Sequence, residues 1–286
     1  PSNYICRAIA RQSPGFFDLD LRVTMTEQIR IASDTYASIG ELYDLEHDSF
    51  EDDIACFMNF IESVGDPVLE LGAGSGRFLI PIAEAGFRVT GLDTSEAMLA
   101  RAAERVANAG FGDLVTLDQR PMDRCDEAPG GSFGVVIAPL NGLMHATSQA
   151  EQRRVLSAAL KALDPRGQLL LDLMNPTPDA LRALDQTFVY ENGWALPDGG
   201  RADKFSSRHV RPSEQIIRTD LWYDVVSAEG TLKRVSSHYE MRYLHRSELE
   251  LLLELAGFAS WEFYGSYELD PYEEGSDRLI VAAEAS

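Results

Sequence analysis

The stretch Val68–Phe78 constrains the fold of this chain more than any other. It joins a short apolar run, a carboxylate at Glu70 and three alternate glycines, and Val89–Asp93 follows at the distance of one βα unit. Glycine lets the backbone turn sharply and approach a ligand closely, and such a loop between a strand and a helix is typical of nucleotide-binding α/β proteins. The sequence therefore predicts a strand, a ligand-binding loop and a helix.

The residues of this loop also favour one kind of ligand. The dinucleotide fingerprint G-x-G-x-x-G requires a glycine where this chain has Arg77. A carboxylate at Glu70 would repel a diphosphate and attract a cationic ligand. The loop therefore favours a sulfonium amino acid, and a dinucleotide oxidoreductase is the structural rival.

The pattern from Glu70 to Gly76 resembles motif I of the class I S-adenosylmethionine-dependent methyltransferases, and Asp93 resembles the acidic residue that follows their second strand. The resemblance implies S-adenosylmethionine as cofactor and S-adenosylhomocysteine as product. It also implies that Asp93 accepts hydrogen bonds from the ribose hydroxyls and that the glycine loop wraps the methionine part. The cofactor-binding residues that it implies are Tyr43, Glu70, Gly72, Ala73, Gly74, Gly76, Arg77, Asp93, Thr94, Met98, Gln119, Met122 and Leu140.

The adenine contacts depart from the pattern of this family. Many members carry an acidic residue after the third strand, and this chain has Pro121 there. Either Asp118 or Gln119 takes the place of this acidic residue, or backbone groups and packing against Met122 hold the adenine. Gly134 stands where an aspartate is common, and we interpret this glycine as structural.

Composition excludes several classes of function. With 46 acidic and 25 basic residues the formal charge is −21, which opposes binding to nucleic acid. The sequence has no apolar run of the ~18 to 20 residues that span a membrane and no recognisable leader, so we predict a cytoplasmic protein. Three scattered cysteines, Cys6, Cys56 and Cys125, fit buried free thiols. The acidic run from Glu41 to Asp53 matches no EF-hand loop, so no metal site is predicted.

Hydrophobic periodicity predicts a doubly wound α/β fold, a seven-stranded Rossmann-like sheet with a helical N-terminal cap and an inserted antiparallel β lid. A helical pattern covers Thr26 to Val64, with a second helix over 50–61, and a turn is expected at 164–167. Period-two alternation over 215–226 and 231–243 predicts a hairpin. The predicted divisions are an extension (1–25), the cap (26–64), the cofactor-binding core (65–175), the lid (176–245) and a closing helix and strands (246–286).

The catalytic prediction concerns His145 and Tyr36. Methyl transfer is an in-line displacement that requires the acceptor atom at ~3 Å from the methyl group, and a positioned base assists it. The segment from Ile137 to His145 resembles the one after strand four in small-molecule methyltransferases, including those that dimethylate amino sugars. His145 is the candidate base, although a lone histidine is more often structural. In the resembling family a tyrosine of the N-terminal helices reaches the active site, and Tyr36, which shares a helical face with Tyr43, is the candidate.

The predicted function is methyl transfer to nitrogen or oxygen of a small molecule. The strip 200–218 carries an excess of basic residues, which suits an anionic acceptor or local pairing with carboxylates equally. Aromatic residues of the hairpin region, among them Phe205, Trp222 and Tyr239, suit an apolar pocket or a homodimer contact. The alternatives are a protein or peptide methyltransferase and a non-catalytic cofactor-binding partner protein.

Overall fold

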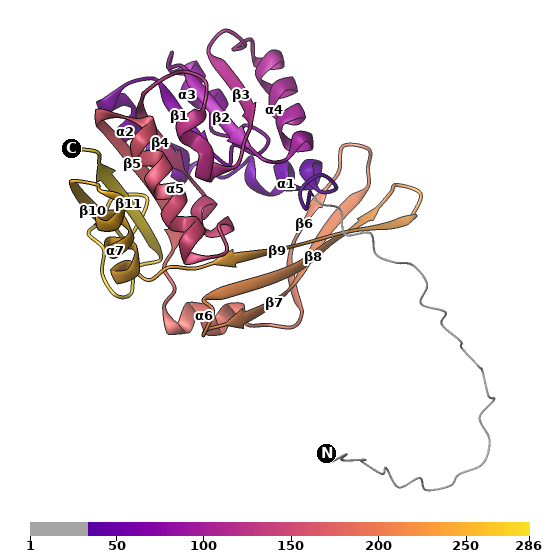
Figure 1. The fold of residues 1–286 in the computed structure, drawn as a ribbon. Helices are drawn as coiled ribbons and strands as arrows, with labels where there is room; N and C mark the ends of the chain where they lie inside the picture. Colours follow the sequence, from indigo (N-terminus) through magenta and orange to yellow (C-terminus); the bar gives the residue numbers. More distant parts are fainter. Residues whose placement is uncertain (1–33) are drawn as a thin grey trace, which may run out of the picture. The chain divides into compact units, whose positions relative to one another are not determined.

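Seven strands form the main sheet, in the order β10-β11-β5-β4-β1-β2-β3. The computed structural model describes residues 34–286 (Figure 1), so the predicted extension at 1–25, Cys6 and the start of the predicted cap helix lie outside the described residues. Strands β1 to β5 run parallel, and β11 is antiparallel to both of its neighbours. The strands are β1 (Val68–Leu71), β2 (Val89–Asp93), β3 (Val115–Gln119), β4 (Phe133–Ala138), β5 (Leu163–Met174), β10 (Ser260–Tyr264) and β11 (Arg278–Glu284). The predicted seven-stranded sheet is confirmed.

Helices cover both faces of this sheet because successive strand residues point to opposite sides. In β4, Val135 and Ile137 belong to one buried cluster, whereas Val136 and Ala138 belong to the other. The first cluster includes residues of α2 (Asp52–Val64), α3 (Leu79–Glu84) and α4 (Glu96–Ala109). The second includes residues of α5 (Gln149–Ala162) and α7 (Arg246–Ala256), with Cys125 of the 3₁₀ turn η1 (Met122–Glu127). The Ser95 hydroxyl caps α4 by accepting a hydrogen bond from the backbone N–H of Met98 at 3.1 Å.

The predicted helix over 26–64 is wrong for residues 34–39. These residues form bends and turns, and α1 covers only Gly40–His47. The Asp34 carboxylate accepts hydrogen bonds from the backbone N–H groups of Tyr36 (3.0 Å) and Ala37 (3.1 Å), which competes with helix formation. Tyr36 therefore precedes the helix that carries Tyr43, and the two tyrosines do not share a helical face.

The predicted turn at 164–167 is also wrong. Extended structure continues from Leu163, and the register against β4 shifts, because Phe133 pairs with Leu163 but Val135 pairs with Gln168. The extra residues bulge out of the ladder instead of reversing the chain. Gly134 lies beside this irregularity, and a Cβ there would lie 2.7 Å from the carbonyl oxygen of Gly65, so its interpretation as a structural glycine is sound.

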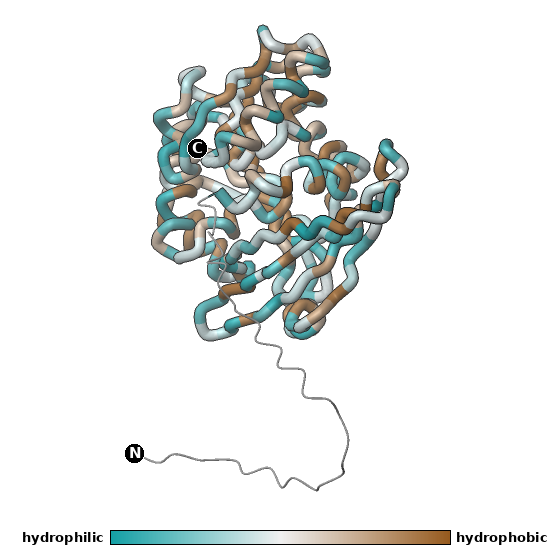
Figure 2. Tube along the Cα trace, turned by 90° about the vertical axis from the view of Figure 1, so that its right-hand side faces the viewer, coloured by the Kyte–Doolittle hydropathy of each residue, from teal (hydrophilic) through white to brown (hydrophobic). Residues whose placement is uncertain are grey.

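A second sheet follows the fifth strand and has the order β6-β7-β8-β9. The predicted hairpin is confirmed as β8 (Ile216–Val226) and β9 (Leu232–Arg242). Three elements of this region were not predicted, namely α6 (Pro178–Leu184), β6 (Val189–Ala195) and β7 (Arg201–Arg211). In β7 the inward positions Lys204, Ser206 and Arg208 are polar, so the strand shows no apolar alternation. Figure 2 accordingly shows hydrophobic and hydrophilic residues intermixed along this sheet.

The inner face of the inserted sheet packs on α1 and on the turn that precedes it (Figure 1). Ile39, Leu221 and Tyr223 form a small buried cluster there. The Lys204 ammonium lies 2.5 and 2.6 Å from the two carboxylate oxygens of Glu46 in α1, and the Tyr223 hydroxyl donates to the same carboxylate at 3.1 Å. Polar and apolar contacts therefore hold the inserted sheet against α1.

Candidate active site

A cavity of about 640 Å³ lies at the carboxyl ends of β1, β2 and β4. The glycine loop, the cap and the segment after β4 all contribute to its wall. Parallel sheets bind ligands at this edge, where the strand order reverses. Thirteen of the fifteen predicted site residues line it, namely Tyr36, Tyr43, Glu70, Gly72, Ala73, Gly74, Arg77, Asp93, Thr94, Met98, Met122, Leu140 and His145.

Two predicted cofactor-binding residues, Gly76 and Gln119, do not line the cavity. Gly76 has a φ of 86°, and a Cβ there would lie 3.2 Å from the Cβ of Ala102 in α4, so this glycine shapes the loop and its packing. The Gln119 side chain instead donates to the carbonyl oxygen of Thr94 at 3.1 Å. Both residues therefore contact parts of the chain that form the cavity wall without lining the cavity themselves.

Sequence reasoning missed several lining residues. Asp34 and Thr35 precede α1, where a helix was predicted, and Asp34 accepts a hydrogen bond from the Ser95 hydroxyl at 2.5 Å. Asp123 also lines the cavity, whereas Asp118 pairs with Arg120 at 2.7 Å and does not line it. The carboxylates at and after the end of β3 indicate that an acidic side chain contributes to the site. Only the packing of the chain determines which of them faces the cavity.

Glu70 carries an unsatisfied acceptor on the cavity wall. Its residue is 2% exposed, and its Oε2 has no hydrogen-bond partner among residues 34–286. Burial raises the pKa of this carboxyl well above its ordinary value, and the nearby Arg77 charge opposes the rise. A buried acceptor without a partner is costly, and a cationic ligand group in the cavity would satisfy it.

Asp93 is fixed by the loops on either side of it. Its Oδ2 accepts from the backbone N–H of Gly74 and its Oδ1 from the N–H of Ser95, both at 2.8 Å. Burial raises the pKa of this carboxyl, and the backbone hydrogen bonds counteract the rise. Because each carboxylate oxygen has two lone pairs, Asp93 keeps free acceptor capacity for a pair of ligand hydroxyls.

Arg77 joins the glycine loop to the cap. Its guanidinium forms a two-pronged ion pair with the Asp53 carboxylate in α2, and its Nη1 also donates to the carbonyl oxygen of Phe50 at 2.6 Å. The side chain of Asp53 is fully buried, and that of Arg77 is 9% exposed. Although Arg77 lines the cavity, its donors are committed to this pair, so the structure gives it an anchoring role.

Three aromatic side chains from separate parts of the chain meet beside the cavity, and two of them, Tyr36 and His145, line it. The Tyr36 hydroxyl lies 3.4 Å from Nε2 of His145, which ends the 3₁₀ turn η2 (Gly142–His145). The ring of Tyr239, from β9, lies 5.8 Å from the His145 ring and stacks on Tyr36 at 6.2 Å. Burial lowers the pKa of His145 to about 4, so this imidazole is unprotonated near neutral pH.

The basic strip of the sequence analysis is fully engaged in ion pairs. Each of its five basic side chains lies within 3.0 Å of a carboxylate. The pairs are Arg201 with Asp203, Lys204 with Glu46, Arg208 with Glu191, Arg211 with Glu240, and Arg218 with Asp220. Local pairing, the second interpretation offered for this strip, therefore accounts for its charge.

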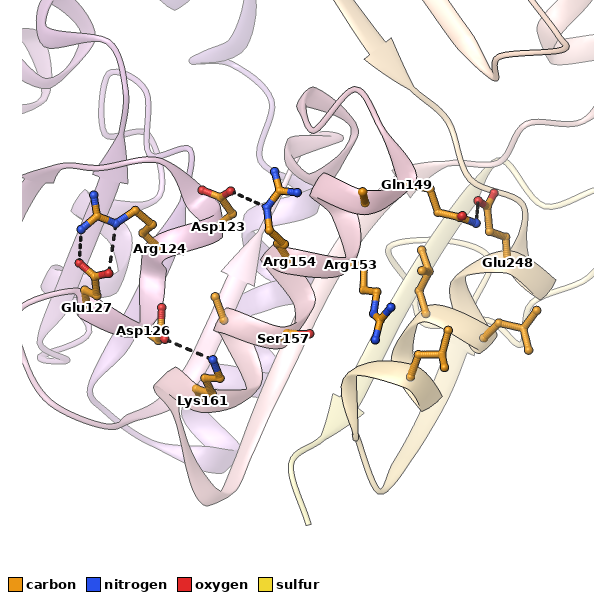
Figure 3. Close-up of a pocket in the computed structure, with 15 residues that line it drawn as sticks. Asp123, Arg124, Asp126, Glu127, Gln149, Arg153, Arg154, Ser157, Lys161 and Glu248 are labelled. Carbon is orange, nitrogen blue, oxygen red and sulfur yellow. Dashed lines mark hydrogen bonds and ion pairs between the residues drawn. The ribbon is translucent and has the colours of Figure 1, made fainter.

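A second hollow, of about 770 Å³, lies between η1, α5 and α7 (Figure 3). Most of its charged side chains pair across its floor, such as Arg154 with Asp123 at 3.0 Å and Lys161 with Asp126 at 3.8 Å. It contains none of the predicted site residues, and its Glu127 carboxylate, whose pKa the hydrogen bond from Arg124 lowers, is held in an ion pair with that arginine. We therefore assign the chemistry to the smaller cavity.

Two further findings concern residues 34–286. No group of three or more histidine, cysteine or acidic side chains in this range is arranged to hold a metal ion. No helix in the same range is long and apolar enough to cross a membrane. Within the described residues Cys56 and Cys125 are free and buried, as predicted.

Comparisons with known proteins agree with this geometry. The family described as "Methyltransferase domain" matches residues 68–167. The cypemycin N-terminal methyltransferase of a Streptomyces species is 26% identical over 77% of this chain and 83% of its own length. The solved structure of the CcbJ methyltransferase from Streptomyces caelestis is 26% identical, with a TM-score of 0.65 over 84% of this chain and 98% of that one. An amino pentose methyltransferase from Micromonospora echinaspora shares the fold at 21% identity, with a TM-score of 0.65 over 86% and 95% of the chains.

Proposed function

We propose that this chain, which is a class I S-adenosylmethionine-dependent methyltransferase similar to the amino-sugar methyltransferases, methylates an amine nitrogen of a small molecule. The observation that carries this proposal is the unprotonated His145 beside Tyr36, in the cavity that also holds Glu70. The proposal chooses between the nitrogen and oxygen acceptors that the sequence left open.

The residues of the cavity fit the cofactor. S-adenosylmethionine supplies, when bound, an electrophilic methyl group on a sulfonium centre. The free Oε2 of Glu70 would accept from the ammonium of its amino acid part, and Asp93 would accept from the ribose hydroxyls. Gly72 has a φ of 77°, and a Cβ there would meet no atom of another element within 4 Å in residues 34–286, which leaves room for ligand atoms against the backbone. Tyr36 and Tyr43 would exclude water from the reacting end.

The protonation state of His145 favours nitrogen over oxygen. A general base works best when its pKa lies near the operating pH, and burial holds the pKa of His145 at about 4. So weak a base removes a proton poorly from an alcohol or phenol hydroxyl, whose pKa lies far above that of His145. A neutral amine attacks with its own lone pair, so formation of the new bond does not wait for removal of its proton. The unprotonated His145 would accept a hydrogen bond from the amine N–H, take its proton as positive charge develops on the nitrogen, and release that proton to solvent.

We expect His145→Gln to lower kcat by about 100-fold, the low end of the range for a positioned base. A base acts only in its unprotonated form, which for His145 predominates above its pKa of about 4. The kcat of the unaltered enzyme should therefore stay level from about pH 8 to about pH 6 and fall only as the pH approaches that pKa. Steady-state kinetics across this range provides the measurement.

The control for this variant is His209→Gln. The side chain of His209 is 70% exposed and lies on the outer face of the inserted sheet, so its loss should leave kcat unchanged. Equal kcat values for the two variants would contradict a role for His145 in proton transfer.

The acceptor class rests on the covered site and on the relatives. The inserted sheet lies against the cap and contributes Tyr239 to the aromatic cluster, an arrangement that suits an acceptor small enough to be enclosed. One related structure is named for an amino pentose, which supports a small amine acceptor. The cypemycin relative is named for a peptide N-terminus, so a peptide amine remains the alternative. That the acceptor is anionic stays a prediction. The basic side chains that suggested it are already paired with carboxylates of the protein.

Mass spectrometry of acceptor panels tests the function. The enzyme is incubated with S-adenosylmethionine and separate panels of amino sugars, amines, phenols, anionic metabolites and short peptides, and S-adenosylhomocysteine is quantified in parallel. A one-methyl mass gain confined to small amines supports the proposal. A gain confined to phenols or to peptides would replace it with the corresponding alternative, and cofactor binding without turnover in any panel would favour the non-catalytic partner protein.

We infer that a second copy of the chain covers the outer face of the inserted sheet. Phe205 and Trp222 stack there at 5.8 Å, and beside them Phe188 and Tyr190 are 63% and 50% exposed. Exposed aromatic patches of this kind mark protein contacts. Phe188→Glu should convert a dimer into a monomer in light scattering coupled to size exclusion, whereas Leu251→Glu, at an equally exposed position on α7, should not. A monomeric unaltered protein would contradict the inference.

A further inference from the structure

The turn after β4 holds two residues in a backbone conformation that they rarely adopt. Leu140 has a φ of 46° and Asn141 a φ of 64°, both in the left-handed region that favours glycine. Such conformations persist only where the surrounding structure imposes them, and they concentrate at functional sites. The contacts that hold this turn therefore bear on the site that it serves.

A buried carboxylate at the end of β5 holds the turn. Asp172 has a fully buried side chain, and its Oδ2 accepts from the backbone N–H of Leu140 at 3.1 Å. Its own carbonyl oxygen accepts from the N–H of Asn141 at 2.8 Å. Each of the two left-handed residues is thus tied to Asp172 through its backbone.

Two side chains from the C-terminal part of the chain fix this carboxylate. The Tyr267 hydroxyl donates to Oδ2 of Asp172 at 3.0 Å, and Nε of Arg278 donates to Oδ1 at 2.8 Å. Burial first, and the negative charge of Asp172 second, raise the pKa of Tyr267, so its hydroxyl stays protonated and keeps donating. Neither Asp172 nor these two partners lines the cavity.

The turn leads directly into the 3₁₀ turn that ends in His145. Pro139, Leu140 and Gly142 line the cavity, and the carbonyl oxygen of Asn141 accepts from the N–H of Met144 at 2.8 Å. A change in the backbone of Asn141 would therefore rotate η2 and move the imidazole away from Tyr36. The chain of contacts runs from the C-terminal segment to the reacting end of the site.

We propose that Asp172, fixed by Tyr267 and Arg278, is a positioning residue that holds the left-handed turn and so aims the His145 imidazole at Tyr36 and the cavity. The catalytic consequence rests on the proposed function of His145. The competing explanation is that this network only joins β5 to β11 and stabilises the sheet. A measurement on His145 itself separates the two.

The first test uses Tyr267→Phe, which removes one hydroxyl and keeps the ring. Tyr264→Phe is the matched control, because the Tyr264 hydroxyl also donates to a carboxylate, that of Glu262 at 2.7 Å, but away from the turn. NMR of the histidine-labelled protein, without acceptor, follows the imidazole signals of His145 through a pH titration. Tyr36 and Tyr239, the aromatic residues in contact with this ring, have raised pKa values and stay protonated throughout.

We expect Tyr267→Phe to shift the His145 signals and to move its midpoint upward from about 4 toward the ordinary value of ~6.5, because a loosened turn admits water to the ring. Tyr264→Phe should leave the His145 signals and their titration midpoint unchanged. With an acceptor that the enzyme methylates, the kcat of Tyr267→Phe should fall roughly tenfold, while its KM stays within about twofold of the unaltered value. This pattern is expected when a reacting group is misplaced.

A second variant, Asp172→Asn, removes the charge that faces Arg278 and should enlarge the same changes to about 100-fold in kcat. If the His145 signals are unmoved in both folded variants, the positioning role is overturned, whatever happens to thermal stability. If the signals move but kcat does not, the positioning role holds, and the proposed function of His145 fails.

Discussion

Replacing Arg77 by methionine lowers the free energy of unfolding by about 3–5 kcal/mol, the expected cost of leaving a buried charge without its partner. The Asp53 carboxylate is fully buried and accepts hydrogen bonds from two nitrogens of the Arg77 guanidinium. Removal of the arginine therefore leaves the negative charge of Asp53 without a partner in the interior. The same guanidinium lies 4.8 Å from the centre of the Phe78 ring, and this packing is lost as well. Urea denaturation of the ligand-free protein, followed by fluorescence, measures the change.

Arg88→Met is the control for this experiment. Arg88 pairs with Asp66 at 2.8 Å, but the two side chains are 64% and 35% exposed. Exposed pairs contribute about 0–1 kcal/mol, so this variant should unfold close to the unaltered protein. Equal losses in the two variants would show that burial does not set the importance of the Arg77 pair.

Replacing Asp93 by alanine weakens the binding of S-adenosylhomocysteine by roughly 100-fold or more. Hydrogen bonds to a charged acceptor contribute about 1.5–3 kcal/mol each, and about 1.4 kcal/mol corresponds to a factor of ten, so loss of two ribose contacts has this size. The substitution also leaves the N–H groups of Gly74 and Ser95 without their acceptor, which loosens the loop around the ligand. Isothermal titration calorimetry gives the dissociation constant directly.

Asp113→Ala serves as the matched variant for Asp93. Asp113 is exposed and lies just before β3, at the edge of the sheet opposite the cavity, so its removal should not change the affinity. Asp93→Asn keeps the shape and part of the acceptor capacity and should bind with intermediate strength. Unchanged affinity in Asp93→Ala would place the ribose elsewhere and remove the argument for this cavity as the cofactor site.

The secondary structure was predictable where local chemistry decides it. The buried strands β1 and β4 are apolar except for Glu70 in β1, and Ser95 has the side chain that caps a helix. Prediction failed where contacts override the local pattern. Polar residues on the inner face of β7 pair with residues of β6 and α1, as Arg208 does with Glu191. The sequence of this strand therefore lacks the alternation of apolar and polar residues that predicts a strand. The Asp34 carboxylate, similarly, replaces helix by turns before α1.

The site divides in the same way between sequence and tertiary structure. The sequence by itself determined the glycine loop, Glu70 and Asp93, because residues that follow neighbouring parallel strands must meet at one edge of the sheet. It also identified Tyr36 and His145 as catalytic candidates, but it did not predict their contact. For Tyr239 it left two roles open, in an apolar pocket or in a dimer contact. Only the tertiary structure brought these three rings together, since they lie on segments of the chain separated by about one hundred residues each. Their meeting depends on how the cap and the inserted sheet pack against the core, and no local pattern encodes that packing.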